Sequence, residues 1–478
     1  MPEITTDDAS AAAEHAMPAE FGTATGVFVV VSSMVGVGIL TTSGYTVLGT
    51  GSNFAMIMLW ALGGVVALCG ALTIAELAAA LPKSGGDYVY LHEAFGPLPA
   101  FLSGWVSFLL GFAGPIAVAS LTASEYFLKA TGAATGGGVV TPARLATILV
   151  LVFGVIHTRP RSGTVRVQAA VTMIKLGFLI AFAVGGIVLG APRYENLLDP
   201  PALEPKLVPT MLLSLVYISY GYTGWNAASY IAGEIRDPGR RLPRAILIGT
   251  GLVTALYLAL NTAYALALSA ADIAKIAQRP GPDPLASFAR DAAEVLFGTR
   301  VAGIFGVMIG LILLSTVSAY VLTGPRVLHA MAVAGHFPRF AARLSKRSKT
   351  PALATWLQVG WSIFLVHAVG KIDDILKYAS VGLALFSMLA IASIFALRVR
   401  RPDLVRPFRT PGYPWTPAFY LLVTGALTCE AFLSQSSKTP SLYALASILL
   451  GVPFYYLLFR GRRPVATTST PTPHDDGA

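Results

Sequence analysis

The chain has 478 residues, of which 55% are apolar and 12% are charged, and its formal net charge is +10. Soluble domains carry roughly 25% charged residues, so this composition excludes an ordinary water-exposed globular protein. Residues 21–75 contain no Asp, Glu, Lys or Arg, and a helix crosses a bilayer with about 20 apolar residues. We therefore expect a polytopic all-α membrane protein whose basic residues lie in loops and do not bind nucleic acid.

Charged residues, prolines and glycines divide the chain into about twelve apolar segments. We expect a cytoplasmic tail over residues 1–20 and a disordered cytoplasmic tail over residues 460–478. The predicted transmembrane helices are residues 24–46, 53–80, 97–128, 142–158, 167–190, 207–233, 245–270, 301–323, 351–370, 378–397, 412–434 and 440–459.

The basic residues predict the orientation. With the N-terminus inside, 22 of the 34 Lys and Arg residues lie in cytoplasmic segments, 11 lie on the opposite side, and Lys175 remains. Short cytoplasmic loops carry an excess of Lys and Arg, so both termini are expected in the cytoplasm, in an inner or plasma membrane. The first 20 residues contain no Lys or Arg and so do not resemble a cleavable signal peptide.

Glycines occur near the middle of the first and sixth predicted spans, where residues 35–39 read VGVGI and residues 220–226 read YGYTGWN. Close packing of helices through small residues is one explanation. The other is a break in each helix, which frees backbone N–H groups for a carboxylate and C=O groups for an ammonium or a cation. The pair of breaks favours a binding site for a zwitterionic amino acid.

Lys175 is the single charged residue between Val167 and Pro192. It lies roughly 14 Å along the helix from Arg166, at about 1.5 Å per residue, and therefore near the middle of a core about 30 Å thick. A merely tolerated lysine is the alternative, but an ammonium at that depth costs about 3 kcal/mol or more. We expect Lys175 to face a polar interior and to find an acceptor.

Other polar residues give weaker signals. Ser315, Thr316 and Ser318 in the eighth span contribute oxygens to an ion site or bond back to their own helix. Glu76 is expected at the membrane interface, and Glu234 at a helix cap on the cytoplasmic edge. The seven histidines form no close pair, and the metalloprotease and hydrolase motifs are absent from the sequence. We expect no catalytic residue, no metal site, no cofactor and no disulfide.

Four segments resemble the amino acid–polyamine–organocation superfamily, and within it the L-type amino acid transporter (LAT) family and its bacterial relatives. Residues 35–40 (VGVGIL) look like the GSGIF signature of the first span. Residues 82–101 (PKSGGDYVYLHEAFGPLPAF) are similar to the family's loop between the second and third spans. Residues 224–246 are similar to the family's GWN…E..NP.RNLP…AI, and residues 166–175 to its fifth-span K-V-Q…K pattern.

The resemblance implies a LeuT-type fold. It comprises two five-helix inverted repeats over residues 21–192 and 207–398, with discontinuous first and sixth spans, and two peripheral helices within residues 412–459. In this family a lysine at the position of Lys175 takes the place of a sodium ion and bridges the first and eighth spans, and we group Ser315 and Ser318 with it. The implied substrate-binding residues are Ser33, Met34, Gly36, Val37, Gly38, Tyr220, Gly221 and Tyr222.

The implied function is sodium-independent uptake or exchange of neutral L-amino acids by alternating access. Val37 stands where the family usually has Ser, so one hydroxyl contact to the substrate carboxylate is lost. The third span near residues 114–120 offers no carboxylate for a cationic side chain, which favours neutral substrates. Residues 129–141 contain no Cys, so a disulfide-linked heavy chain is not expected.

Two alternatives remain. A polyamine or organic-amine antiporter predicts an acidic side chain in the pocket. A non-transporting membrane sensor predicts an attached soluble domain, and no loop or tail of this chain is long enough to form one.

Overall fold

The structure is a computed structural model that describes residues 17–36, 38–130, 140–189, 193–201, 207–279, 285, 288–368, 372–433 and 438–460. Within these ranges the regular structure is helical, apart from an isolated bridge between Phe21 and Ile235. Eight helices are long and apolar enough to cross a membrane, and four shorter apolar helices bring the described spans to twelve. The chain is therefore an all-α, multi-pass membrane protein, as the sequence predicts.

The first five spans include one that is split in two. Their elements are α2 (Thr23–Met34), α3 (Gly38–Thr50), α4 (Asn53–Ala80), the short α5 (Asp87–Phe95), α6 (Pro97–Val106) continued by the π-helix η1 (Ser107–Phe112) and α7 (Ala113–Ala130), α8 (Pro142–Thr158), α9 (Arg161–Val188) and η3 (Tyr194–Leu197).

The remaining seven spans also include a split one, the sixth. Their elements are α10 (Leu207–Gly221), η4 (Ala227–Glu234), α11 (Pro238–Ala267), α12 (Ala270–Ala277), α13 (Phe288–Phe297), α14 (Thr299–Val333), η6 (Arg339–Ala342), α15 (Ala352–Ala368), α16 (Ile372–Arg400), α17 (Trp415–Leu433), α18 (Lys438–Phe454) and η7 (Tyr455–Phe459).

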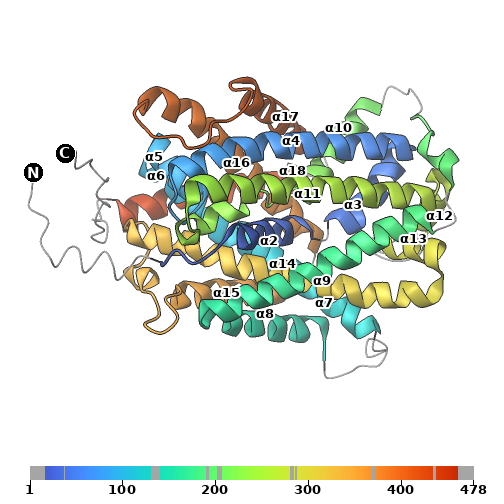
Figure 1. The fold of residues 1–478 in the computed structure, drawn as a ribbon, viewed down its shortest axis with the longest axis horizontal. Helices are drawn as coiled ribbons and strands as arrows, with labels where there is room; N and C mark the ends of the chain where they lie inside the picture. The colour runs from blue at the N-terminus through green and yellow to red at the C-terminus, as the bar shows by residue number, and fades with distance from the viewer. Residues whose placement is uncertain are drawn as a thin grey trace, which may run out of the picture.

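Local chemistry sets several helix starts. The Ser52 side chain accepts a hydrogen bond from the backbone N–H of Ala55 and caps α4. Pro97 and Pro238 stand at the first positions of α6 and α11, where a missing N–H costs nothing. Inside the molecule, α2 packs against α9, α11 and α14. The two halves of the first span thus lie among the long helices (Figure 1).

The eighth span differs from its prediction in length. The sequence predicts it over residues 301–323, but α14 continues to Val333. The reason is Arg326, which is 1% exposed and donates from Nε and Nη2 to the Glu234 carboxylate at 2.9 and 3.2 Å. Glu234 is itself fully buried and belongs to this ion pair, so it is not an interfacial helix cap.

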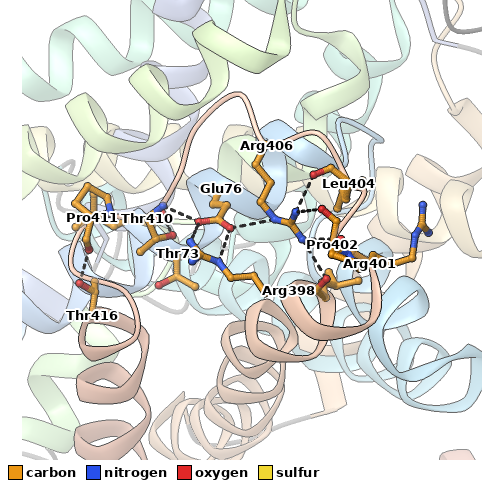
Figure 2. Close-up of polar contacts among 12 residues, drawn as sticks. Thr73, Glu76, Arg398, Arg401, Pro402, Leu404, Arg406, Thr410, Pro411 and Thr416 are labelled. Carbon is orange, nitrogen blue, oxygen red and sulfur yellow. Dashed lines mark hydrogen bonds and ion pairs between the residues drawn. The ribbon is translucent and has the colours of Figure 1, made fainter.

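Glu76 is buried as well, in contrast to the interfacial position expected for it. Arg398 donates to its carboxylate from Nε at 3.0 Å and from Nη2 at 2.7 Å, and the Thr410 N–H donates at 2.6 Å. The Nε of Arg406 lies 3.5 Å away on the other side. Figure 2 shows the Glu76 carboxylate between the guanidinium groups of Arg398 and Arg406. These contacts join the end of α4 to α16 and to the loop after α16.

We predict that Glu76→Gln destabilises the folded chain by about 3 kcal/mol. Removing one partner of a buried ion pair costs about 3–5 kcal/mol, and the value lies at the low end because Arg398 is 25% exposed. The measurement is thermal unfolding of the purified protein in detergent. Glu93→Gln is the control, because Glu93 pairs with the exposed Lys83 and its loss should change stability by no more than about 0.5 kcal/mol. Equal melting temperatures for the two variants would contradict the prediction.

Candidate functional site

The first span is interrupted where the sequence predicts a break. Helix α2 ends at Met34, Val35 is extended with φ −78° and ψ 96°, Gly36 lies in a bend, and α3 begins at Gly38. Val37 lies outside the described residues. The last carbonyl groups of a helix have no partner within it, and at mid-membrane depth such groups must be satisfied by other protein groups.

Lys175 on α9 donates hydrogen bonds to two of these carbonyls. The side chain is fully buried, and its Nζ donates to Val35 O at 2.6 Å, to Ser32 O at 3.2 Å and to Thr316 Oγ1 at 3.2 Å. Thr316 in turn donates to Val35 O at 2.9 Å. An ammonium has three donors; two of them go to carbonyls at the negative end of α2 and the third goes to Thr316 on α14.

Two tyrosine hydroxyls donate to the carbonyls of Ser33 and Met34, which lie between those of Ser32 and Val35. Tyr320 on α14 donates to Ser33 O at 3.2 Å. The Tyr257 hydroxyl on α11 lies 2.7 Å from Met34 O and 2.9 Å from Gly221 O, so one proton serves the ends of both broken helices. The sequence reasoning missed both residues. The available signal was a tyrosine inside an apolar span, because a buried hydroxyl needs a partner.

The sixth span is broken opposite the first. Helix α10 ends at Gly221, residues 222–226 form turns, and the 3-10 helix η4 follows. Gly224 has φ +99°, and a Cβ there would lie 2.8 Å from the carbonyl carbon of Ser33. A Cβ on Gly38 would lie 2.7 Å from the Cα of Gly221. The glycines therefore serve both purposes considered for them, since they allow the breaks and the close approach of the two spans.

A small cavity of about 20 Å³ lies between the two breaks. Five of the predicted substrate residues line it: Ser33, Met34, Gly36, Gly38 and Tyr220. The rest of its lining is Pro115, Val118, Ala119, Thr223, Thr316 and Tyr320. Among the described residues that form this wall, none carries a charged side chain.

Gly221 and Tyr222, also predicted for this site, are placed elsewhere. Gly221 packs against the backbone of Gly38 and does not line the small cavity. The Tyr222 hydroxyl donates to Trp60 O at 3.0 Å, and its ring centroid lies 5.5 Å from that of Trp60 and 5.1 Å from that of Tyr257. The chain leaves the α-helix after Gly221, so Tyr220 and Tyr222 point to different cavities.

The two serines grouped with Lys175 have hydrogen-bond partners other than its ammonium. Ser315 Oγ lies 3.5 Å from Ser32 Oγ. Ser318 donates to Gln168 Oε1 at 2.6 Å and lies 2.9 Å from His157 Nε2. Thr316, between them on α14, is the residue that reaches the ammonium. Successive side chains are rotated by about 100° around a helix, and the sequence did not show which of the three faces α9.

A larger cavity of about 110 Å³ adjoins the small one and shares Thr223 and Tyr320 with it. Its lining includes Asp87, Asn226 and Tyr230. Asp87 was not among the predicted site residues, because it belongs to a loop in the sequence, and only the fold brings it against the sixth span.

A polytopic membrane protein with two helices broken opposite each other around a small uncharged cavity has the architecture of a secondary transporter. The comparisons with known proteins agree. The family model described as amino acid permease matches residues 21–453, and the chain belongs to this family, within the amino acid–polyamine–organocation superfamily.

The relatives are amino acid transporters. The Asc-type amino acid transporter 1 of Mus musculus is 30% identical over an aligned length of 454 residues, with 92% of this chain and 81% of the relative covered. The b(0,+)-type amino acid transporter 1 of Rattus norvegicus is 29% identical, covering 92% and 87% of the two chains. The cystine/glutamate transporter of Homo sapiens is 27% identical, covering 90% and 83%. The family consists of transporters and not of enzymes, and amino acid transport is the activity these relatives support for this chain.

We predict that Gly38→Ala lowers the free energy of unfolding by about 1–3 kcal/mol, the usual cost of overpacking. The added Cβ would meet the Gly221 backbone at 2.7 Å, and backbone cannot rotate away. Gly36→Ala is the control, because its nearest neighbour would be Thr316 Cγ2 at 3.9 Å. Thermal unfolding without substrate measures both. A Gly38→Ala protein as stable as Gly36→Ala would show that the two spans are not in contact.

Proposed function

We propose that this protein is a sodium-independent secondary transporter that takes up or exchanges neutral L-amino acids by alternating access. The substrate would lie between the broken ends of the first and sixth spans, with Ser33, Met34, Gly36, Val37 and Gly38 on one side and Tyr220 on the other. Backbone N–H groups at the start of α3 would receive the carboxylate, since a helix N-terminus favours negative charge. Freed carbonyls would receive the α-ammonium.

The observation that carries the proposal is the position of the Lys175 ammonium. Two carbonyls and a hydroxyl surround Nζ, and oxygens of this kind are what a hard cation such as sodium requires. The lysine places a covalently attached positive charge at the end of α2. A sodium ion is then not needed to hold the broken end in place.

Two properties of the small cavity support neutral substrates. Its described lining contains no charged side chain, so a substrate side chain with a charge would be buried without a partner, which is costly. Its volume of about 20 Å³ is close to that of one or two waters on the same measure. The break must therefore open before even a small amino acid enters, which is the behaviour that alternating access requires.

The remaining parts of the proposal rest on the sequence. We propose that both termini lie in the cytoplasm, that the membrane is an inner or plasma membrane, and that residues 21–192 and 207–398 form the two inverted repeats. We also propose that no heavy chain is attached by a disulfide, because residues 129–141 contain no Cys.

Lys175→Ala should reduce uptake of labelled L-alanine into proteoliposomes at least tenfold. The carbonyls of Ser32 and Val35 lose their donor, and the broken end of α2 loses its counter-charge. Wild-type uptake should be equal in sodium and in choline buffers. Lys83→Ala, which removes an exposed lysine, should transport normally. Uptake that needs sodium, or that persists in a folded Lys175→Ala protein, would refute the mechanism.

Competition should separate substrates by charge. We expect unlabelled L-alanine to abolish uptake of the label. L-Aspartate adds one carboxylate to the alanine side chain and should compete at least tenfold less well, because the small cavity offers that charge no partner. Equal competition by the two amino acids would show that the neutral lining does not select the substrate.

A further inference from the structure

Asp87 is an acidic residue that faces the larger cavity. It begins α5, and it is buried although it belongs to a connecting segment. Asn226 Nδ2 donates to both carboxylate oxygens at 3.2 Å, and the Tyr230 hydroxyl donates to Oδ2 at 3.2 Å. An ionised carboxylate has about four acceptor positions, so one position on Oδ1 is left for a ligand.

The charge of Asp87 has no counter-charge in the described part of the chain. Three carboxylates are buried there, and the other two, Glu76 and Glu234, are each paired with an arginine. Around Asp87 the donors are an amide and a phenol, both neutral, and no described Lys, Arg or His lies within ion-pair distance of it. A buried carboxylate without a cation is costly, so this one is incomplete without a positively charged ligand.

The walls of the cavity suit such a ligand. Aromatic rings surround the space beside Asp87: those of Phe112, Trp225, Tyr230, Tyr320 and Tyr420. Phe112 packs edge-on against Tyr230, with ring centroids 5.1 Å apart and an interplanar angle of 87°. Aromatic faces attract cations, including organic ammonium groups.

The third span changes its winding at this cavity. The π-helix η1 covers Ser107–Phe112, and Ser107, Gly111 and Phe112 all belong to the cavity lining. Single-turn π-helices are rare and frequently occur at functional sites. Here the wider turn places the Phe112 ring between Tyr230 and Tyr320.

We propose that Asp87, Asn226 and Tyr230, together with the aromatic walls, form a binding subsite for an organic ammonium group. The group is carried on the side chain of a cationic amino acid or belongs to a free amine. A cavity of about 110 Å³ suits a short alkylammonium, because an engineered cavity of about 150 Å³ holds benzene. The subsite is distinct from the neutral site between the breaks, and Thr223 and Tyr320 line both cavities.

Ionisation of Asp87 gives the subsite a pH dependence. Burial raises the pKa of its carboxyl to about 6, while hydrogen bonds from Asn226 and Tyr230 oppose that rise. The other titratable groups that act on it electrostatically are the phenols of Tyr90, Tyr230 and Tyr420, from α5, η4 and α17. Asp87 is therefore mostly ionised at pH 7.5 and mostly protonated at pH 5, whereas an alkylammonium stays charged at both.

The test measures binding to the purified full chain by calorimetry, with n-butylamine and with its neutral counterpart n-butanol. At pH 7.5 butylamine should bind and butanol should not. Asp87→Asn should weaken butylamine binding at least tenfold, because it removes the charge that a charge-assisted hydrogen bond needs. Glu93→Gln, which removes a partly exposed carboxylate from the same helix, should leave the affinity unchanged. Lowering the pH to 5 should weaken binding by about tenfold in the wild type and not at all in Asp87→Asn.

A second pair of ligands distinguishes the two sources of the ammonium. L-Lysine and L-norleucine differ mainly in the terminal ammonium. If Asp87→Asn weakens L-lysine and butylamine alike, the subsite takes cationic amino acids. If it weakens butylamine alone, the subsite takes free amines.

Ala384→Leu keeps the carboxylate and fills the cavity, since Ala384 lines it, and it should abolish butylamine binding even if Asp87→Asn does not fold. Butylamine that fails to bind the wild type, or that binds both variants unchanged, would overturn the proposal. Sodium-independent alanine uptake, measured in parallel, reports on the proposed function separately.

Discussion

The structure depends on how the broken end of α2 is satisfied. Four consecutive carbonyls, from Ser32 to Val35, point out of the helix end at a depth where water does not satisfy them, and each would cost several kcal/mol if left alone. Side chains from three helices donate hydrogen bonds to these carbonyls, namely Lys175 on α9, Tyr257 on α11, and Thr316 and Tyr320 on α14. The break is therefore a junction at which four helices are joined by hydrogen bonds.

This junction also limits how the molecule can move. Separating α2 from Lys175, Tyr257, Thr316 or Tyr320 would break a hydrogen bond to one of its last carbonyls. A ligand that brings its own ammonium and carboxylate offers replacement partners at the same place. The proposed mechanism thus links binding and opening through the same few backbone groups, because a ligand shifts a two-state equilibrium by binding one state more tightly.

The sequence revealed local features well and long-range ones poorly. Twelve apolar segments and the glycines at residues 36, 38, 221 and 224 are local signals, and they predicted the spans and both breaks. The depth of Lys175 followed from simple counting along a helix. The C-terminal end of α14 could not be predicted in this way, because Arg326 is stabilised by Glu234, which lies 92 positions earlier in the chain. The same limit applied to the choice among Ser315, Thr316 and Ser318, since only the packing of α14 against α9 decides which side chain reaches the ammonium.

The buried charges show where the described chain is complete and where it is not. Glu76 and Glu234 are paired with arginines, and the Lys175 ammonium donates to two carbonyls at the negative end of α2 and to one hydroxyl. Asp87 has hydrogen bonds but no opposite charge, and it lies beside an aromatic cavity that adjoins the one between the breaks. If Asp87 served only to begin α5, a solvent-exposed position would be enough, because a carboxylate is stabilised by the positive end of the helix dipole there as well. Burying it against a cavity adds a desolvation cost that helix capping alone does not explain, and a cationic ligand would remove that cost.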